Sequence, residues 1–403
     1  MSANAVSMVG NQLTFLALPW FVLQTTGSAG RVGLAAAVEV VGIILSSFFS
    51  GALIDRIGFR RSSVLADCAS GITIALIPLL DRLVGLAFWE LLVLIFSVAI
   101  FNTPGGTARR SILPDLADGA GMGLERATSF DQAIRNFSLL AGPLAAGLLI
   151  ASIAARNVLW VDAVTFGFSA TVIAAFVPLP RTGPMFSGTS YLTEALQGVR
   201  FIMADRVILS MGLLGSYVNA VGAALVTVVL PVFGERVFHS SVSLGVMVAA
   251  DGAGALIGTI VFGAVGHRWP RRASLFSAFM ASFIGLLVLV PTPSLLISSA
   301  ALSIDGLAFG VIGPLTYTIY QERIPAELRG RVLGTLFAVH RLAAPAGVIL
   351  AGYAIQVFSL SSALAAVTGL SLLIPLMVLG APALRSLGPP ERVPIVAGDA
   401  GEL

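Results

Sequence analysis

Acidic side chains lie inside several long apolar runs of this sequence, where an ionised carboxylate is costly and therefore indicates a function. A carboxyl group in such a place either accepts hydrogen bonds for structure or takes up and releases a proton. Depth separates the candidates, at about 1.5 Å of helix rise per residue. The deepest acids are Glu39, Asp251 and Asp305, and Glu90 is somewhat shallower. These four are the predicted proton-coupling candidates.

Two further acids, Asp67 and Asp162, lie within about six residues of the end of a run, where a side chain still reaches interfacial water. We expect both to be structural. For Asp305, the roles of proton carrier and of hydrogen-bonded structural acid both remain open. Glu39 and Asp251 are 212 residues apart, which matches the period of an internal repeat in the chain.

The composition requires lipid as the solvent for most of the surface. The chain has 403 residues, of which 57% are hydrophobic and only 11% are charged, and its mean hydropathy is +0.96. A soluble domain carries about 25% charged residues. All 23 basic residues are Arg, and they are scattered rather than clustered, so a nucleic-acid partner is not expected.

The sequence lacks the residues that several kinds of chemistry require. One cysteine, Cys68, excludes an intrachain disulfide. We find no metal-ligand spacing and no pairing of a nucleophile with a base, so we expect neither a cofactor nor an enzyme. The phosphate-binding pattern G-x-x-x-x-G-K-[ST] is also missing. Any energy-consuming process that the protein carries out must therefore be driven by an ion gradient rather than by ATP.

Twelve apolar runs are long enough to cross a membrane, which takes roughly 20 residues each. The first begins almost at Met1 and is interpreted as a span rather than a signal peptide, and a start upstream of Met1 remains open. The predicted spans are 3–25, 31–54, 62–80, 83–105, 130–153, 157–178, 207–230, 242–265, 274–293, 295–318, 333–357 and 361–384.

The distribution of Arg predicts the orientation. Seventeen Arg fall in the links and the tail on one side of the predicted membrane, and four fall on the other. Because positive residues stay in the cytoplasm, both termini are predicted to be cytoplasmic.

The sequence also repeats itself. The stretch "GALIDRIGFRRSS" at 51 has an echo, "GAVGHRWPRRAS", at 263, and Pro114 corresponds to Pro325 at nearly the same offset. Two parallel six-helix repeats are a known transporter architecture. We therefore predict two pseudo-symmetric halves, 1–178 and 207–384, joined by a cytoplasmic linker at 179–206 and followed by a disordered tail at 385–403.

The stretch at 51 resembles the loop signature G-x-x-x-D-R-x-G-R-R between spans 2 and 3 of the major facilitator superfamily. The matching residues are Gly51, Asp55, Arg56, Gly58, Arg60 and Arg61. The resemblance implies a conformational gate that latches the two halves together in the outward-open state. An ordinary positive-inside loop is the alternative.

A second stretch, "LLAGPLAAGLL", resembles the antiporter motif of span 5 in the same family, with Gly142, Pro143 and Gly147 at its core. Plain small-residue packing is the alternative. The stretches "LALPWFVLQTTGSAG", "YQERIPAELRGRV" and "DAVTFGFSATVI" are similar to the drug- and siderophore-exporter branch, in particular to Tap-type multidrug efflux pumps. The family's span-4 Arg is missing, and Asn11 stands where an Asp is usual.

The resemblance adds expectations for the site. It places span 10 on the central cavity, which makes Asp305 the leading proton carrier, although the family pattern has no acid at these positions. It also suggests that Glu39 faces Arg341, whereas Arg135 is expected to pair with Asp131 at i,i+4. Substrate contacts are predicted from polar and aromatic groups on the cavity helices, namely Asn11, Gln12, Tyr217 and Asn219.

We therefore predict an all-α integral membrane protein with the major facilitator fold, located in a bacterial inner membrane and acting as a monomer. Its expected activity is secondary active export of small amphipathic compounds, such as drugs, by proton antiport with alternating access. One alternative is a dedicated exporter of a siderophore or another metabolite. A second is a membrane sensor that kept the fold and lost transport.

Overall fold

The computed structural model describes residues 2–177, 191–290, 294–325 and 328–387. Its described part is helical and contains twelve candidate membrane spans, as the sequence predicted. The first half consists of α1 (Ser2–Thr26), α2 (Ala29–Ile57), α3 (Phe59–Leu83), α4 (Phe88–Ser111), α5 (Leu113–Gly119), α6 (Leu124–Ile153) and α7 (Ala155–Phe176). The short helix α8 (Tyr191–Ala204) follows.

The second half begins with a composite span of α9 (Arg206–Ala224), the π-helical turn η1 (Leu225–Val229) and α10 (Leu230–Arg236). Then come α11 (Ser241–Val265), η2 (Gly266–Arg268), α12 (Arg271–Leu289) and α13 (Leu295–Arg323). The next span is divided into α14 (Arg329–Leu342) and α15 (Ala344–Val357), and α16 (Leu360–Gly380) and η3 (Pro382–Arg385) complete the described chain.

Local chemistry explains several of these boundaries. The side chains of Ser28, Ser240 and Ser359 each accept a hydrogen bond from a backbone N–H in the first turn of α2, α11 and α16. Gly58 separates α2 from α3 at a φ of 81° and a ψ of 158°, a conformation that essentially only glycine adopts. The reversal between these two spans therefore requires that glycine.

Corresponding arginines make the same contact between two helices in each half. Arg60 at the start of α3 donates to the carbonyl oxygen of Ala174 near the end of α7. Arg272, 212 positions later at the start of α12, donates to the carbonyl oxygens of Val378 and Leu379 near the end of α16. A cation at a helix C-terminus satisfies carbonyl groups that have no partner within the helix. The internal repeat thus preserves a contact as well as a sequence pattern.

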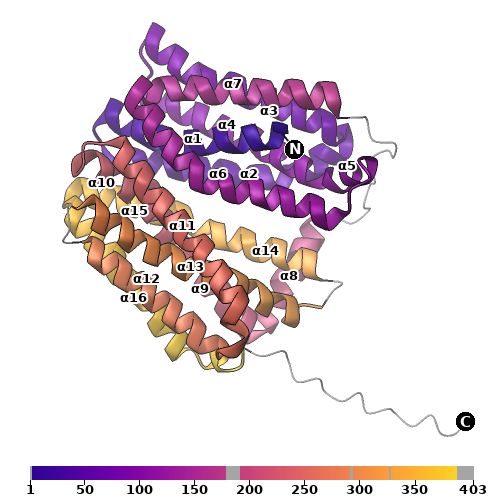
Figure 1. Ribbon diagram of the computed structural model, residues 1–403, viewed down its shortest axis with the longest axis vertical. Helices are drawn as coiled ribbons and strands as arrows, with labels where there is room; N and C mark the ends of the chain where they lie inside the picture. Colours follow the sequence, from indigo (N-terminus) through magenta and orange to yellow (C-terminus); the bar gives the residue numbers. More distant parts are fainter. Residues whose placement is uncertain (1, 178–190, 291–293, 326–327, 388–403) are drawn as a thin grey trace, which may run out of the picture.

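The two halves meet at one end of the bundle and diverge toward the other (Figure 1). At the closed end α2 packs on α15 and α6 packs on α11. Glycines make both contacts, Gly33 with Gly352 and Gly147 with Gly245, and we call these four residues the glycine seam. Small residues let helices approach closely in a membrane. A core of buried side chains from both halves, including Trp20, Val228 and Leu244, lies at this end.

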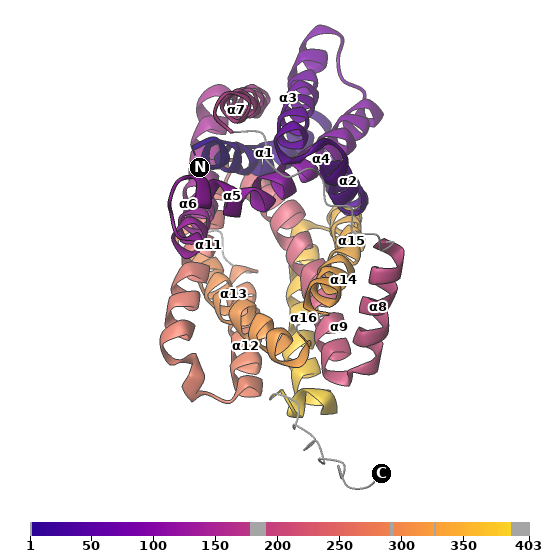
Figure 2. The ribbon, with the colours of Figure 1, turned by 90° about the vertical axis from the view of Figure 1, so that its right-hand side faces the viewer.

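The open end carries the links α2–α3, α4–α6, α11–α12 and α13–α14, which hold most of the Arg residues, and we call it the Arg-rich face. Figure 2 views the molecule onto this face and shows α8 at the edge of the bundle beside α9 and α14. Arg331 of α14 donates to the side-chain oxygen of Gln197 of α8, at 2.7 Å. Residue 178 lies outside the described residues, and so do 179–190 of the predicted linker and 388–403 of the predicted tail.

Candidate functional site: a cavity between the two halves

A cavity of about 940 Å³ lies between the halves on the side of the Arg-rich face. Its wall comes from α1, α2, α4, α6 and α7 of the first half and from α14 of the second. Ligand cavities of about 300–1,000 Å³ hold drug-sized molecules. The cavity therefore has room for a small organic compound.

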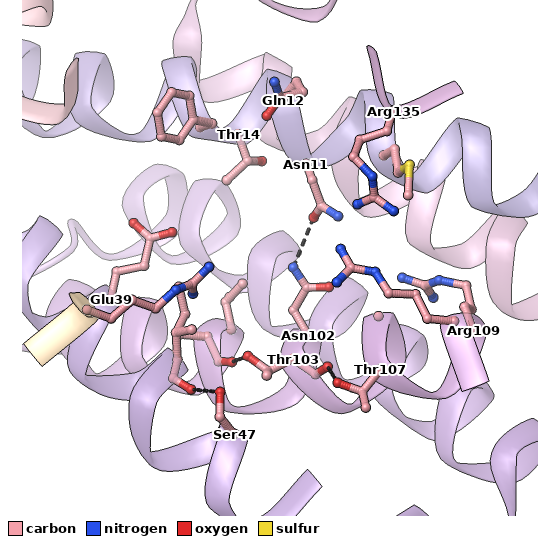
Figure 3. A pocket seen from close by; sticks show the side chains of 18 of the residues that line it. Asn11, Gln12, Thr14, Glu39, Ser47, Asn102, Thr103, Thr107, Arg109 and Arg135 are labelled. Carbon is pink, nitrogen blue, oxygen red and sulfur yellow. Dashed lines mark hydrogen bonds between the residues drawn. The ribbon is translucent and has the colours of Figure 1, made fainter. Parts of the chain in front are cut away.

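Amide side chains form part of the wall. Asn102 of α4 donates a hydrogen bond to the side-chain oxygen of Asn11 of α1, at 3.0 Å (Figure 3). The neighbouring Gln12 packs against Gly142 of α6, where a Cβ would lie 3.0 Å from Gln12 Cγ. Asn11 and Gln12, both predicted as cavity residues, do line the cavity. Asn102 was not among the predicted cavity residues, although its polar amide inside an apolar run was a visible signal.

The other two predicted contacts lie elsewhere. Tyr217 of α9 donates its hydroxyl to the carbonyl oxygen of Leu370 of α16, at 3.0 Å, and Asn219 is exposed. Neither residue lines the cavity in this conformation. Their proposed contact with substrate remains a prediction.

Two of the described acids line the cavity, namely Glu39, which was among the four predicted candidates, and Asp162, which was expected to be structural. Glu39 of α2 has no hydrogen-bond or ion-pair partner among the residues that the structure describes. Asp162 of α7 is 1% exposed and accepts hydrogen bonds from Thr14 of α1 and from Thr165, the latter at 3.0 Å. Asp162 therefore joins two helices and also borders the cavity.

The remaining acids lie away from the cavity wall. Asp305 of α13 is 6% exposed and accepts a hydrogen bond from Ser282 of α12. The α13 backbone at Gly306 packs on the α11 backbone at Asp251, so both carboxylates belong to one pair of packed helices that contributes no residue to the cavity wall. Span 10 was expected to line the cavity, yet α13 contributes no residue to its wall in this conformation.

Glu90 lies shallower than the sequence analysis assumed. The predicted span began at 83, but α4 begins at Phe88, so Glu90 occupies the first turn of the helix. There its carboxylate accepts a hydrogen bond from the backbone N–H of Ala87, at 2.9 Å. An acid at this position stabilises the helix N-terminus.

Asp67 has structural partners within the protein, although it was expected to reach interfacial water. It is fully buried, accepts a hydrogen bond from Ser169 of α7 at 2.6 Å and forms an ion pair with Arg109 of α4 at 2.7 Å. The predicted pair of Arg135 with Asp131 is confirmed, at 2.8 Å. Arg135 and Arg109 both line the cavity.

Arg110 and Arg341 also line the cavity, from α4 and α14 respectively. In the described part of the chain neither has a carboxylate within 4.0 Å. The suggested ion pair between Glu39 and Arg341 is therefore absent in this conformation, although both residues line the same cavity.

The gate-loop residues lie at the Arg-rich face. Arg56 and Arg61 are exposed, Arg60 is bound to α7, and a Cβ at Gly51 or Gly58 would meet nothing within 4 Å. The side chain of Asp55 lies outside the described residues. The span-5 motif lies at a different place, because Gly142 borders the cavity through Gln12 and Gly147 belongs to the glycine seam.

Comparison with known proteins agrees with this architecture. The family profile described as Major Facilitator Superfamily matches residues 1–348. The multidrug efflux pump Tap of Mycobacterium tuberculosis (strain ATCC 25618 / H37Rv) is 29% identical, over 95% of this chain and 91% of that protein. Tap of Mycolicibacterium fortuitum is 30% identical, over 94% and 93%. A crystal structure of a point mutant of the nucleoside transporter NupG superposes with a TM-score of 0.80 at 10% identity, covering 94% of this chain and 98% of that chain.

Proposed function

Because this chain belongs to the major facilitator superfamily of transporters and is a multi-pass protein of a bacterial inner membrane, we propose that it exports small amphipathic compounds, such as drugs, in exchange for protons. The observation that carries the proposal is a drug-sized cavity, sealed at one end by the glycine seam, with two carboxyl groups on its wall. The curated relatives at 29–30% identity are multidrug efflux pumps, which supports export rather than uptake.

The shape of the molecule supports transport by alternating access. The Arg-rich face, predicted to be cytoplasmic, is the open end, so this conformation would load cargo from the cytoplasm. Release on the other side requires the glycine seam to part and the Arg-rich face to close. We infer that the loop from Gly51 to Arg61 acts in that closing, because it resembles the family signature.

Glu39 is the best-supported site for proton coupling. A coupling acid must face water in turn from each side of the membrane, and it must exchange its proton with cargo. Glu39 lines the cavity and has no partner among the described residues that would hold it ionised. Asp162 shares the cavity but is engaged by two threonine hydroxyls. Asp305, Asp251 and Glu90 remain candidates with no contact to the cavity wall.

The test uses everted membrane vesicles that contain the protein. A proton gradient is imposed, and its partial collapse is followed as a panel of amphipathic drugs is added. We expect collapse with several drugs in the parent and a loss of collapse in Glu39→Gln. Glu125→Gln is the matched control, because it removes the same charge from the first turn of α6, away from the cavity.

Three results would change the proposal. Collapse that survives in Glu39→Gln but is lost in Asp305→Asn would move the coupling site to the second half. Drug flux without any proton movement would remove antiport from the proposal. No flux of any compound, from protein shown to be folded, would favour the membrane sensor.

A further inference from the structure

Four arginines line the cavity, and three of them lie within electrostatic range of the fourth, Arg110, so we call this part of the wall the cationic side. Arg109 and Arg110 come from α4, Arg135 comes from α6 and Arg341 comes from α14, so both halves contribute. Figure 3 shows Arg109 and Arg135 on the side of the cavity opposite to Glu39. An arginine guanidinium keeps its charge in proteins. This side of the cavity is therefore permanently cationic.

Among the residues that the structure describes, carboxylates pair with two of these four arginines. Asp67 pairs with Arg109 at 2.7 Å, and Asp131 pairs with Arg135 at 2.8 Å. Asp131 also accepts a hydrogen bond from Asn4, at 2.8 Å. Two positive charges, on Arg110 and Arg341, are left without a carboxylate within 4.0 Å in the described part of the chain.

The surroundings of Arg110 are unfavourable for an isolated cation. It lies within electrostatic range of Arg135, Arg341 and Arg109, and among the described residues Asp131 is the carboxylate that offsets them. Repulsion between like charges is stronger in a partly enclosed cavity than in bulk water, because the effective dielectric constant is lower. An anion placed between the guanidinium groups would relieve this repulsion and accept their hydrogen bonds.

Aromatic side chains line the same cavity. Phe48 of α2 and Phe337 of α14 both line the cavity and remain 43% and 50% exposed. Large exposed apolar side chains inside a cavity are suited to the apolar body of a ligand. The cavity thus combines an anion-binding side with an apolar wall. Both halves of the protein contribute residues to each of these surfaces.

We propose that Arg110 and Arg341 bind an anionic group of the cargo, such as a sulfonate, carboxylate or phosphate, while its apolar body lies against Phe48 and Phe337. This inference rests on the proposed export function and narrows its substrates to amphipathic anions and zwitterions. Because one arginine comes from each half, the bound anion also draws the halves together at the open end.

Two fluorescent dyes with one aromatic skeleton test the inference, namely anilinonaphthalene sulfonate and N-phenylnaphthylamine, which lacks the sulfonate. Their dissociation constants are measured on the purified protein in uncharged detergent. We expect the sulfonate to bind the parent more tightly than the neutral dye. Arg110→Gln and Arg341→Gln should each weaken sulfonate binding by about ten-fold or more, the usual loss of a charge-assisted hydrogen bond, and leave the neutral dye unchanged.

The control variant is Arg126→Gln, which removes the same charge from the start of α6 without lining the cavity. Equal binding of the two dyes by the parent, or an equal effect of Arg126→Gln, overturns the inference. So does a parallel loss of both dyes in Arg110→Gln and in Arg341→Gln, because that result indicates a structural role.

Proton flux in vesicles, measured on the same variants, separates the two proposals. Drug-driven proton flux without preference for the sulfonate refutes the anion site and leaves the export function standing. Arginine-dependent sulfonate binding without proton flux supports the anion site and refutes antiport.

Discussion

Substitution of Gly147 by alanine should open the sealed end of the molecule. A Cβ at this position would lie 2.6 Å from the carbonyl oxygen of Ser241 and 3.2 Å from the Cα of Gly245, both on α11. Carbon and carbonyl oxygen normally approach no closer than about 3.3 Å. The two helices would have to separate by roughly 0.7 Å to accommodate the methyl group.

The added methyl group destabilises only the conformation in which this end of the molecule is closed. Overpacking by a methyl group typically costs about 1–3 kcal/mol. The contact between α6 and α11 belongs to the state in which this end is closed, so the same group costs little once the halves have parted. A difference of about 1–3 kcal/mol shifts the equilibrium roughly 5- to 150-fold toward the state that is open at this end.

Chemical accessibility of a buried reporter measures the shift. Ala29 at the start of α2 is fully buried, and its carbonyl oxygen would lie 2.7 Å from a Cβ at Gly352, on the other contact of the glycine seam. We would introduce Ala29→Cys in a Cys68→Ser background, since Cys68 is exposed. Gly147→Ala should raise the rate of reaction with a membrane-impermeant maleimide at least about five-fold.

The control is Gly167→Ala in α7, where a Cβ would meet nothing within 4 Å. It should leave the reaction rate of Ala29→Cys unchanged. An unchanged rate in Gly147→Ala, in protein that elutes and melts like the parent, would refute the argument. It would mean that the closed end adjusts locally, without movement of the two halves.

Asp67→Asn leaves Arg109 buried without its carboxylate and should destabilise the protein by about 3–5 kcal/mol. The loss is measured as a lowered melting temperature in detergent. The double variant Asp67→Asn plus Arg109→Gln should recover part of it. Gly58→Ala forces an alanine into a φ of 81° and should cost about 1–3 kcal/mol, whereas Gly51→Ala should be close to neutral in the same melting experiment because its φ is helical. Asp305→Asn should keep drug-driven proton flux within about two-fold of the parent, since an amide still accepts a hydrogen bond there, and complete loss of flux would contradict the assignment of coupling to the cavity acids.

The number of spans was accessible from the sequence because a membrane imposes a simple rule of length and polarity. Which face of each span lines the cavity could not be predicted from the sequence. Helices such as α9 are apolar around most of their surface, so periodicity gives little information on which side faces a partner. The packing of α9 against α16 therefore determines the position of Tyr217, and no local pattern in the sequence carries that information.

Two errors in helix boundaries had consequences for the site. Glu90 seemed deep because the apolar run begins before the helix does, whereas α4 begins at Phe88. At the other end, Arg110 was assigned to a link, yet α4 continues to Ser111 and carries that arginine into the cavity wall. An apolar run marks the part of a helix in lipid and not its full length. The cationic side of the cavity was hidden for this reason.

The two ends of the molecule are built from different interactions, and salt should therefore affect them differently. The glycine seam is held by close packing of uncharged backbone, which ionic strength does not screen. Closure of the Arg-rich face brings Arg110 and Arg341 toward the other cationic groups of the cavity, and at physiological ionic strength such repulsion decays over about 8 Å. Added salt weakens that repulsion, so ionic strength alone should shift the empty protein toward the outward-open state.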